Sequence, residues 1–215
     1  MVNTLETILV SFVEFPLPPL EGNPTHSYLM EVNGYLNACS ASVHSNLGNG
    51  AVGYLAITMQ PAGFAIACPN AFITPTNLGA TLILANPPPS IAIIGIQTRA
   101  HSEYLQIFND YYNVKKACKK IIFALIPEAY YRSFKNKHTG FATVSCLNIL
   151  THLCTTCGTL QYYEVQENNE MMKQPITADT LFKDFIEQVE VTVDAVATQL
   201  PYMPEQIYSI AFTLV

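Results

Sequence analysis

The apolar positions of this chain recur mostly at the three- and four-residue spacing of an α-helix. One such stripe runs from His26 to about His44, and a longer one runs from about Ile91 to Ile126. Whether the longer helix is interrupted near Asn113 stays open at this stage. Pro127 ends it, because the residue before a proline disfavours helical backbone angles. The pattern therefore predicts a mainly helical protein.

Shorter helical patterns fill the sequence after this proline. The apolar residues of Leu147–Cys154 fall on one helix face, and Gly158 is predicted to end that helix in the left-handed conformation. Lys137–Gly140 has the composition of a turn. The helices predicted here cover 127–132, 143–157, 161–173, 179–194 and 205–215.

The N-terminal half is less regular. Residues 1–24 end in a proline-rich stretch, and we expect an irregular arm because proline fixes the backbone and removes donors. The short apolar segment 51–59 is compatible with either a helix or a strand. Residues 60–90 hold six prolines and two glycines, which predicts a long loop or a pair of short extended pieces.

The length of 215 residues suits one large domain or two small ones, with the best boundary near Ile126 and Pro127. Half of the residues are hydrophobic and only 12% are charged, against about 25% in an ordinary globular domain. A surface this poor in charge is either buried against partners or prone to aggregation, and the first of these favours an oligomer. We therefore expect a homo-oligomer.

The N-terminal segment does not have the pattern of a secretory signal. The apolar stretch Ile8–Val13 is flanked by Glu6 and Glu14 and lacks a basic region before it, so it does not resemble a secretory signal. No apolar run approaches the roughly 18 residues that cross a bilayer. The six cysteines are scattered among apolar neighbours, which favours reduced thiols in a cytoplasmic protein. The chain stops at Val215 without a polar tail, and we expect that the natural reading frame continued.

Positive charge is concentrated in one region although the net charge is −6. No Lys or Arg precedes Arg99, and the first four clustered lysines share one helix face. Phosphate contact, with salt-sensitive and sequence-independent affinity for RNA, is one interpretation. The other is a solvated helix face that pairs with the acidic 179–194 helix of a neighbouring copy. The candidate RNA-contact residues are Lys115, Lys116, Lys119, Lys120, Arg132, Lys135 and Lys137.

The sequence offers one motif that invites a metal or redox interpretation, Cys154-x-x-Cys157 beside His152. A structural zinc site needs a second ligand pair, and none follows Cys157. A redox pair opens a helix, whereas this one closes a helix. Packing thiols are thus favoured. Glycine-rich phosphate loops and aspartic-protease triplets are absent from the sequence. We therefore expect a non-enzymatic protein with no catalytic residue, metal, cofactor or small-molecule substrate.

Five segments of the second half form a recognisable series, namely Tyr130–Val144, Leu150–Gly158, Asn168–Pro175, Leu181-Phe182 and Pro204–Ile207. Together they resemble the Gag-like capsid region of copia-type LTR retrotransposons. Weaker similarity occurs in Ala41–Ala56 and Phe72–Ala80. The resemblance covers about residues 28–215 and is more specific from Ala117 onward.

This resemblance implies an all-α, two-lobed capsid protein that self-associates around element RNA. The N-terminal lobe would span 25–126, with the proline-rich loop 60–90, and a truncated C-terminal lobe would span 127–215. Cys154 and Cys157 stand where the family has aromatic residues, and the zinc knuckle of nucleocapsids is absent from the sequence. The implied function is assembly of cytoplasmic virus-like particles. The alternative is a host-adopted or decayed Gag-derived module that binds RNA or protein without forming particles.

Overall fold

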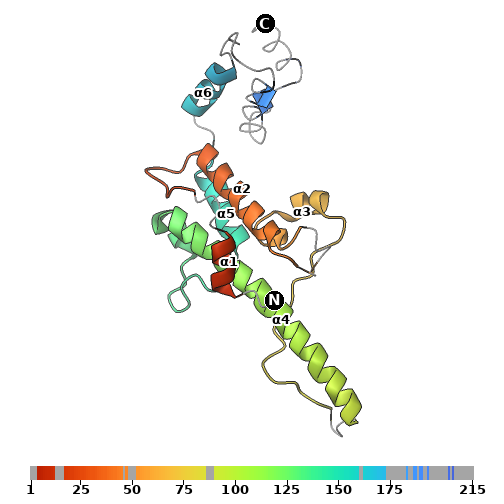
Figure 1. Ribbon diagram of the computed structural model, residues 1–215. Helices are drawn as coiled ribbons and strands as arrows, with labels where there is room; N and C mark the ends of the chain where they lie inside the picture. The colour runs from red at the N-terminus through yellow and green to blue at the C-terminus, as the bar shows by residue number, and fades with distance from the viewer. Residues whose placement is uncertain are drawn as a thin grey trace. The chain divides into compact units, whose positions relative to one another are not determined.

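A computed structural model shows a helical chain (Figure 1). It describes residues 4–12, 17–45, 47, 52–85, 90–159 and 162–172, with isolated positions from 183 to 205. Within these residues there is no β-strand, only one isolated bridge between Asn136 and Gly140, so the all-α class is confirmed. The α-helices are α1 (Leu5–Ser11), α2 (His26–Ser42), α3 (Pro61–Ala67), α4 (Ile91–Leu125), α5 (Cys146–Thr156) and α6 (Tyr162–Met172), and the 3₁₀ helices are η1 (Leu55–Ile57), η2 (Glu128–Tyr130) and η3 (Arg132–Phe134).

The chain divides into two compact units. Unit 1 comprises 1–21 and 32–151, and unit 2 comprises 22–31 and 152–215. This division does not fall at the Ile126/Pro127 boundary suggested by the sequence. The reason lies in unit 1, where the rings of Tyr131 and Phe141 both lie within about 5 Å of the ring of Phe123 on α4. The chain after Pro127 thus folds back on the end of α4.

The core of unit 1 is built from apolar positions at helical spacing. Val32 and Leu36 of α2 have no exposed surface, and the same holds for Cys118 and Ile122 of α4 and for Ile149 of α5. The two residues of α2 are four positions apart, and so are the two residues of α4, which places each pair on one helix face. Burial of these faces is the main source of stability in a helical protein of this kind.

A helix forms within the N-terminal segment 1–24, where the sequence predicted an irregular arm. The Thr4 side chain accepts a hydrogen bond from the Thr7 backbone N–H and caps α1 at its N-terminus. Ile8 and Phe12 are buried, and α1 packs against α4 (Figure 1). The prediction was wrong for residues 5–11 because the prolines of this segment begin only after α1.

The region 51–90 also contains more helix than expected. The apolar segment 51–59 forms η1, and the predicted loop 60–90 begins with α3, whose first residue is Pro61. Proline suits that position because its missing N–H has no helical partner there anyway. Leu55, Phe64 and Cys68 form a small buried cluster. From Cys68 to residue 85 the chain has no regular structure, as the sequence predicted.

α4 is continuous from Ile91 to Leu125, without an interruption near Asn113. It ends where the sequence predicted, with Pro127 two residues beyond its last residue. The segment after this proline forms η2 and η3 instead of one α-helix. The predicted turn before Gly140 is present, and the Asn136 side chain accepts hydrogen bonds from the backbone N–H groups of His138 and Thr139.

α5 and α6 agree with the helices predicted at 143–157 and 161–173, and α5 ends just before Gly158 as predicted, but the left-handed conformation predicted for this glycine was wrong. Gly158 does not have a positive φ angle. A Cβ atom at this position would lie 2.7 Å from the carbonyl oxygen of Cys154, so glycine is needed there for close backbone packing. The predicted helix 179–194 lies mostly outside the described residues, and 205–215 lies outside them after its first position.

In unit 2, the first turn of α2 is capped from far along the chain. The buried Glu164 side chain of α6 accepts a hydrogen bond of 3.1 Å from the backbone N–H of His26. The His26 Nδ1 atom lies 2.8 Å from the carbonyl oxygen of Gly158. A carboxylate is favourable at a helix N-terminus because it meets unpaired N–H groups there. No local sequence pattern signals such a cap.

Candidate nucleic-acid interface

The C-terminal half of α4 contributes to a pocket rich in lysine. Its volume is about 350 Å³, near the lower end of the range for small-ligand pockets. The structure therefore brings the first four predicted contact residues together at one site, and no acidic residue lines it. We call it the lysine pocket, and its lining residues are Leu5, Tyr112, Lys115, Lys116, Lys119, Lys120, Phe123, Phe141 and Ala142.

Lys119 differs from the other three lysines because it holds the pocket together. Its Nζ atom donates hydrogen bonds to the carbonyl oxygens of Phe141 (2.9 Å) and Ala142 (3.1 Å). Burial lowers the pKa of the Lys119 ammonium group. The neighbouring Cys146 raises this pKa, and the positive charge of Lys115 lowers it. We conclude that Lys119 fixes the 141–142 segment against α4, and that its neighbours are the better candidates for contact with a ligand.

Aromatic side chains form a large part of the pocket wall. Phe123 and Phe141 lie with ring centroids 5.1 Å apart, and Phe141 also meets Tyr131 edge to face at 5.3 Å. On the preceding turns of α4, the Lys116 Nζ atom lies 4.5 Å from the ring centroid of Tyr112. This arrangement places cations beside flat apolar surfaces, which is the combination used by proteins that bind nucleotides.

The other three predicted contact residues lie outside the lining of this pocket. Lys135 pairs with Glu128 at 2.6 Å, and its Nζ atom lies 5.7 Å from the ring centroid of Phe141. Arg132 and Lys137 are exposed and make no ion pair with any described residue. The seven residues are therefore not equivalent, because Lys119 and Lys135 already have partners.

The sequence pattern missed the part of the pocket that comes from other elements. Phe123 lies four residues after Lys119, so helical spacing alone could have placed its side chain on the same face as the lysines. Leu5 and Phe141 lie more than 100 and about 20 residues from Lys119, and only the packing of α1 and of the segment after η3 on α4 brings them together.

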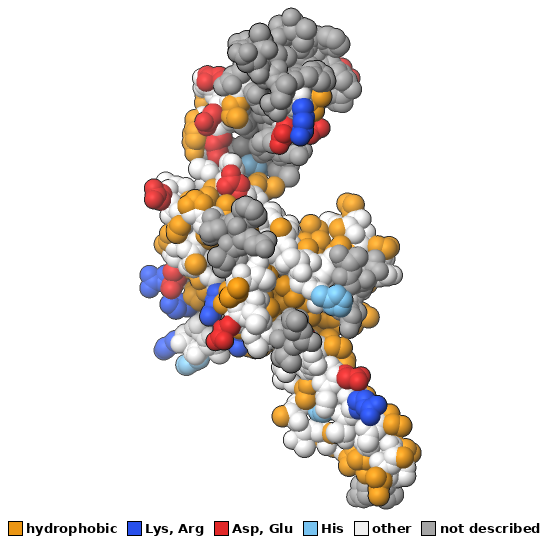
Figure 2. Space-filling view, in the orientation of Figure 1, with side chains coloured by type: hydrophobic (Ala, Val, Ile, Leu, Met, Phe, Trp, Pro, Cys, Tyr) orange, Lys and Arg blue, Asp and Glu red, His pale blue; other side chains and the backbone are white. Residues whose placement is uncertain are grey.

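The other end of α4 has a different character. No residue from Ile91 to Asn113 is buried, and we call this stretch the α4 arm. At about 1.5 Å per residue its 23 residues extend for about 35 Å. Ile91, Ile93 and Ile96 are 89%, 47% and 69% exposed. Figure 2 shows hydrophobic side chains gathered at the free end of α4, where few charged groups lie.

A long stretch without charged side chains leads into this arm. No Asp, Glu, Lys or Arg occurs between Glu31 and Arg99. The irregular segment that leads to α4 adds further exposed apolar side chains, namely Ile73, Leu78, Ile83 and Leu84. In soluble proteins, exposed apolar patches are common at contact sites for other molecules.

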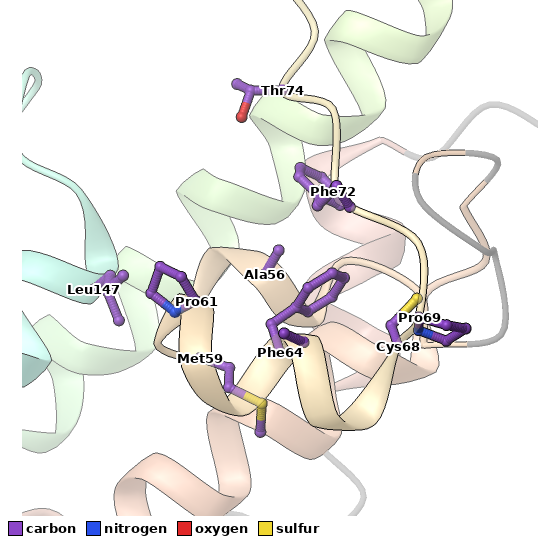
Figure 3. A pocket seen from close by; sticks show the side chains of 11 residues that line it. Ala56, Met59, Pro61, Phe64, Cys68, Pro69, Phe72, Thr74 and Leu147 are labelled. Carbon is purple, nitrogen blue, oxygen red and sulfur yellow. The ribbon is translucent and has the colours of Figure 1, made fainter.

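A second pocket, of about 420 Å³, lies between η1, α3 and the start of α5 (Figure 3). Met59, Phe64 and Phe72 project around it, with Leu147 at one end. The Cys68 thiol is the one titratable group in its lining, and it donates to the carbonyl oxygen of Asn70. Its other lining residues are apolar or carry only a hydroxyl group.

The Cys154-x-x-Cys157 motif forms no metal centre within the described residues. No group of three or more His, Cys, Asp or Glu side chains in that part of the chain is arranged to hold an ion. Both thiols are free and partly exposed, and the Nδ1 atom of His152 lies 3.2 Å from the Thr156 hydroxyl. The thiols are thus available for alkylation.

We expect iodoacetamide at pH 8 to modify Cys154 and Cys157 well before Cys118 and Cys146. Burial raises the pKa of Cys146 to about 11 and that of Cys118 well above its usual value, so neither forms the reactive thiolate at this pH. Peptide mass spectrometry over a time course measures the order. Equal rates at all four thiols in the native protein would contradict the burial of Cys118 and Cys146.

Comparison with known protein families, with curated proteins and with solved structures finds no match to this chain. In the described part of the chain, none of the helices combines the length and the apolar character that crossing a bilayer requires.

Proposed function

We propose that this protein is a structural, self-assembling protein of the Gag-like capsid type, from a copia-type retrotransposon, which packages the RNA of its element in the cytoplasm. It acts by association with copies of itself and not by catalysis. The sequence resemblance suggests the family. The α4 arm supports the proposed assembly, and the lysine pocket supports the proposed RNA binding.

The observation that carries the assembly proposal is the exposed apolar surface of the α4 arm. Burying an isoleucine side chain contributes about 1.5–3 kcal/mol, and the arm offers Ile91, Ile93 and Ile96 at its end. With no charged residue between Glu31 and Arg99, little electrostatic repulsion opposes the approach of a second copy. A homotypic contact buries this surface without requiring any other partner.

The lysine pocket supports the RNA part of the proposal. Lys115, Lys116 and Lys120 form no hydrogen bond or ion pair through their ammonium groups among the described residues, and no acid lines the pocket. A group of like charges without counter-charges attracts an anion, and a phosphate backbone provides one at regular spacing. An acidic helix of a neighbouring copy is the competing partner.

The alternative is a Gag-derived module that binds RNA or protein without forming particles. The four lysines of the pocket begin at Lys115, after the last residue of the α4 arm, so the charged site and the apolar end of α4 occupy different parts of the helix. This arrangement supports the alternative. RNA binding by such a module would not depend on the arm.

Multi-angle light scattering across a dilution series tests the proposal. We expect the average mass to rise with protein concentration above that of one chain, because association through an apolar surface is governed by mass action. RNA binding with a constant monomeric mass would instead support the alternative module, and a monomer that binds no RNA would overturn both.

A further inference from the structure

The lysine pocket contains an apolar wall that phosphate contact alone does not use. The flat rings of Phe123 and Phe141 line the same cavity as the lysines, and Tyr112 lines it too, with Lys116 over its ring. A ligand that fills this pocket therefore needs an aromatic or apolar part as well as a negative charge. Inorganic phosphate or a smooth anionic surface matches only the charged half.

We propose that the lysine pocket holds one nucleotide of a single-stranded RNA, with its base against Phe123 and Phe141 and its phosphates on Lys116 and Lys120. This inference rests on the proposed RNA packaging and deepens it, because it states which form of RNA is bound and how.

The size and shape of the pocket favour a single strand over a duplex. A cavity of about 350 Å³ admits one small ligand, and a base can enter it only when it is not paired and stacked within a double helix. Base–aromatic packing tolerates any sequence, since every base has a flat face. The strand would thus be bound without strong sequence preference.

The position of each lysine agrees with a phosphate contact at the rim of the pocket and a base contact at its aromatic wall. Lys116 and Lys120 are exposed and lie one helical turn apart, so both can follow a strand that enters the pocket. Lys115 is half-buried at the same site, and Lys119 holds Phe141 in place through its two bonds to backbone carbonyls. The charged rim contacts phosphates, while Lys119 maintains the aromatic wall.

Fluorescence anisotropy with labelled oligonucleotides and the full chain tests this inference. The probes are an unstructured single-stranded RNA, an abasic sugar–phosphate strand of equal length and charge, and an RNA duplex. Base–aromatic packing predicts that the single strand binds at least about fivefold more tightly than the abasic strand. Adenosine monophosphate should compete at least about tenfold more weakly than the strand, because it contacts fewer lysines.

Two kinds of variant separate the base contact from the charge contact. Phe123→Leu and Phe141→Leu should each reduce binding of the single strand toward that of the abasic strand and leave abasic binding unchanged. Lys116→Gln with Lys120→Gln should weaken both probes and flatten the salt dependence. Tyr162→Leu in α6 is the matched aromatic control, since Tyr162 is 83% exposed and lies outside the pocket lining. Thermal melting verifies that each variant is folded.

The possible outcomes point to different conclusions. Equal affinity for all three polymers, lowered by the lysine variants, would overturn the base contact and leave the proposed RNA packaging intact. Adenosine monophosphate binding as tightly as the strand would show that the pocket serves a free nucleotide, and would overturn the assignment to RNA. No binding of any probe would remove the RNA part of the proposed function as well.

Discussion

Gly53→Ala should destabilise the protein severely, although it adds only one methyl group. Gly53 has a φ angle of +50°, which costs an alanine about 1–2 kcal/mol. A Cβ atom would also lie 2.4 Å from the carbonyl oxygens of both Ala41 and Val43, so backbone must move. The chain near Gly53 is held against the end of α2, because the Tyr54 N–H donates to the Ser40 carbonyl oxygen at 2.9 Å. We expect a loss of about 3 kcal/mol or more of the free energy of unfolding, a large part of the roughly 5–15 kcal/mol of a typical domain.

Gly34→Ala provides the matched control with the opposite sign. Gly34 lies inside α2 on an exposed face, and no atom lies within 4 Å of a Cβ placed there. Alanine in a helix interior is more stable than glycine by about 0.5–1 kcal/mol. Urea unfolding followed by circular dichroism measures both variants. Similar midpoints for the two would show that the chain near Gly53 does not approach the end of α2 as described.

Ile93→Glu combined with Ile96→Glu should abolish self-association at concentrations where the native chain assembles. Both side chains are exposed on the α4 arm, and glutamate keeps the helix propensity high. Loss of two buried isoleucines, at about 1.5 kcal/mol or more each, weakens association by about a hundredfold or more. The introduced charges add repulsion between copies. Light scattering measures the shift from oligomer to monomer.

Gln97→Glu combined with Ser102→Glu is the control for added charge. Both residues are exposed on the same arm and neither contributes apolar surface. If apolar burial drives assembly, this variant still assembles, although more weakly. Loss of assembly in both double variants to the same extent would assign the effect to charge alone and would contradict a contact through the isoleucines.

The sequence predicted those elements whose signals are local. The stripes of α2, α4 and α5 and the end of α4 before Pro127 follow from spacing and proline chemistry, and the structure has them. The first four lysines were placed on one helix face for the same reason, and they line one pocket. Their role in RNA contact stays a prediction.

The features that the sequence did not reveal depend on contacts between distant segments. The cap of α2 by Glu164 joins residues 138 positions apart, and no motif marks it. Gly158 was assigned a positive φ by analogy with helix ends, whereas its actual constraint is the close approach of the Cys154 carbonyl group. The helix α1 was missed because the prolines after it dominated the composition of the segment. Phe141 entered the lysine pocket only through tertiary packing.

The central claim is that copies of this chain associate through the α4 arm. Hydrogen–deuterium exchange of the backbone amides of 91–113, measured in dilute and in concentrated protein, tests it most directly. We predict slower exchange in the concentrated sample across the arm, with unchanged exchange in the buried C-terminal half of α4. Exchange in the arm that stays fast and independent of concentration, while the mass of the particles rises, would contradict this claim.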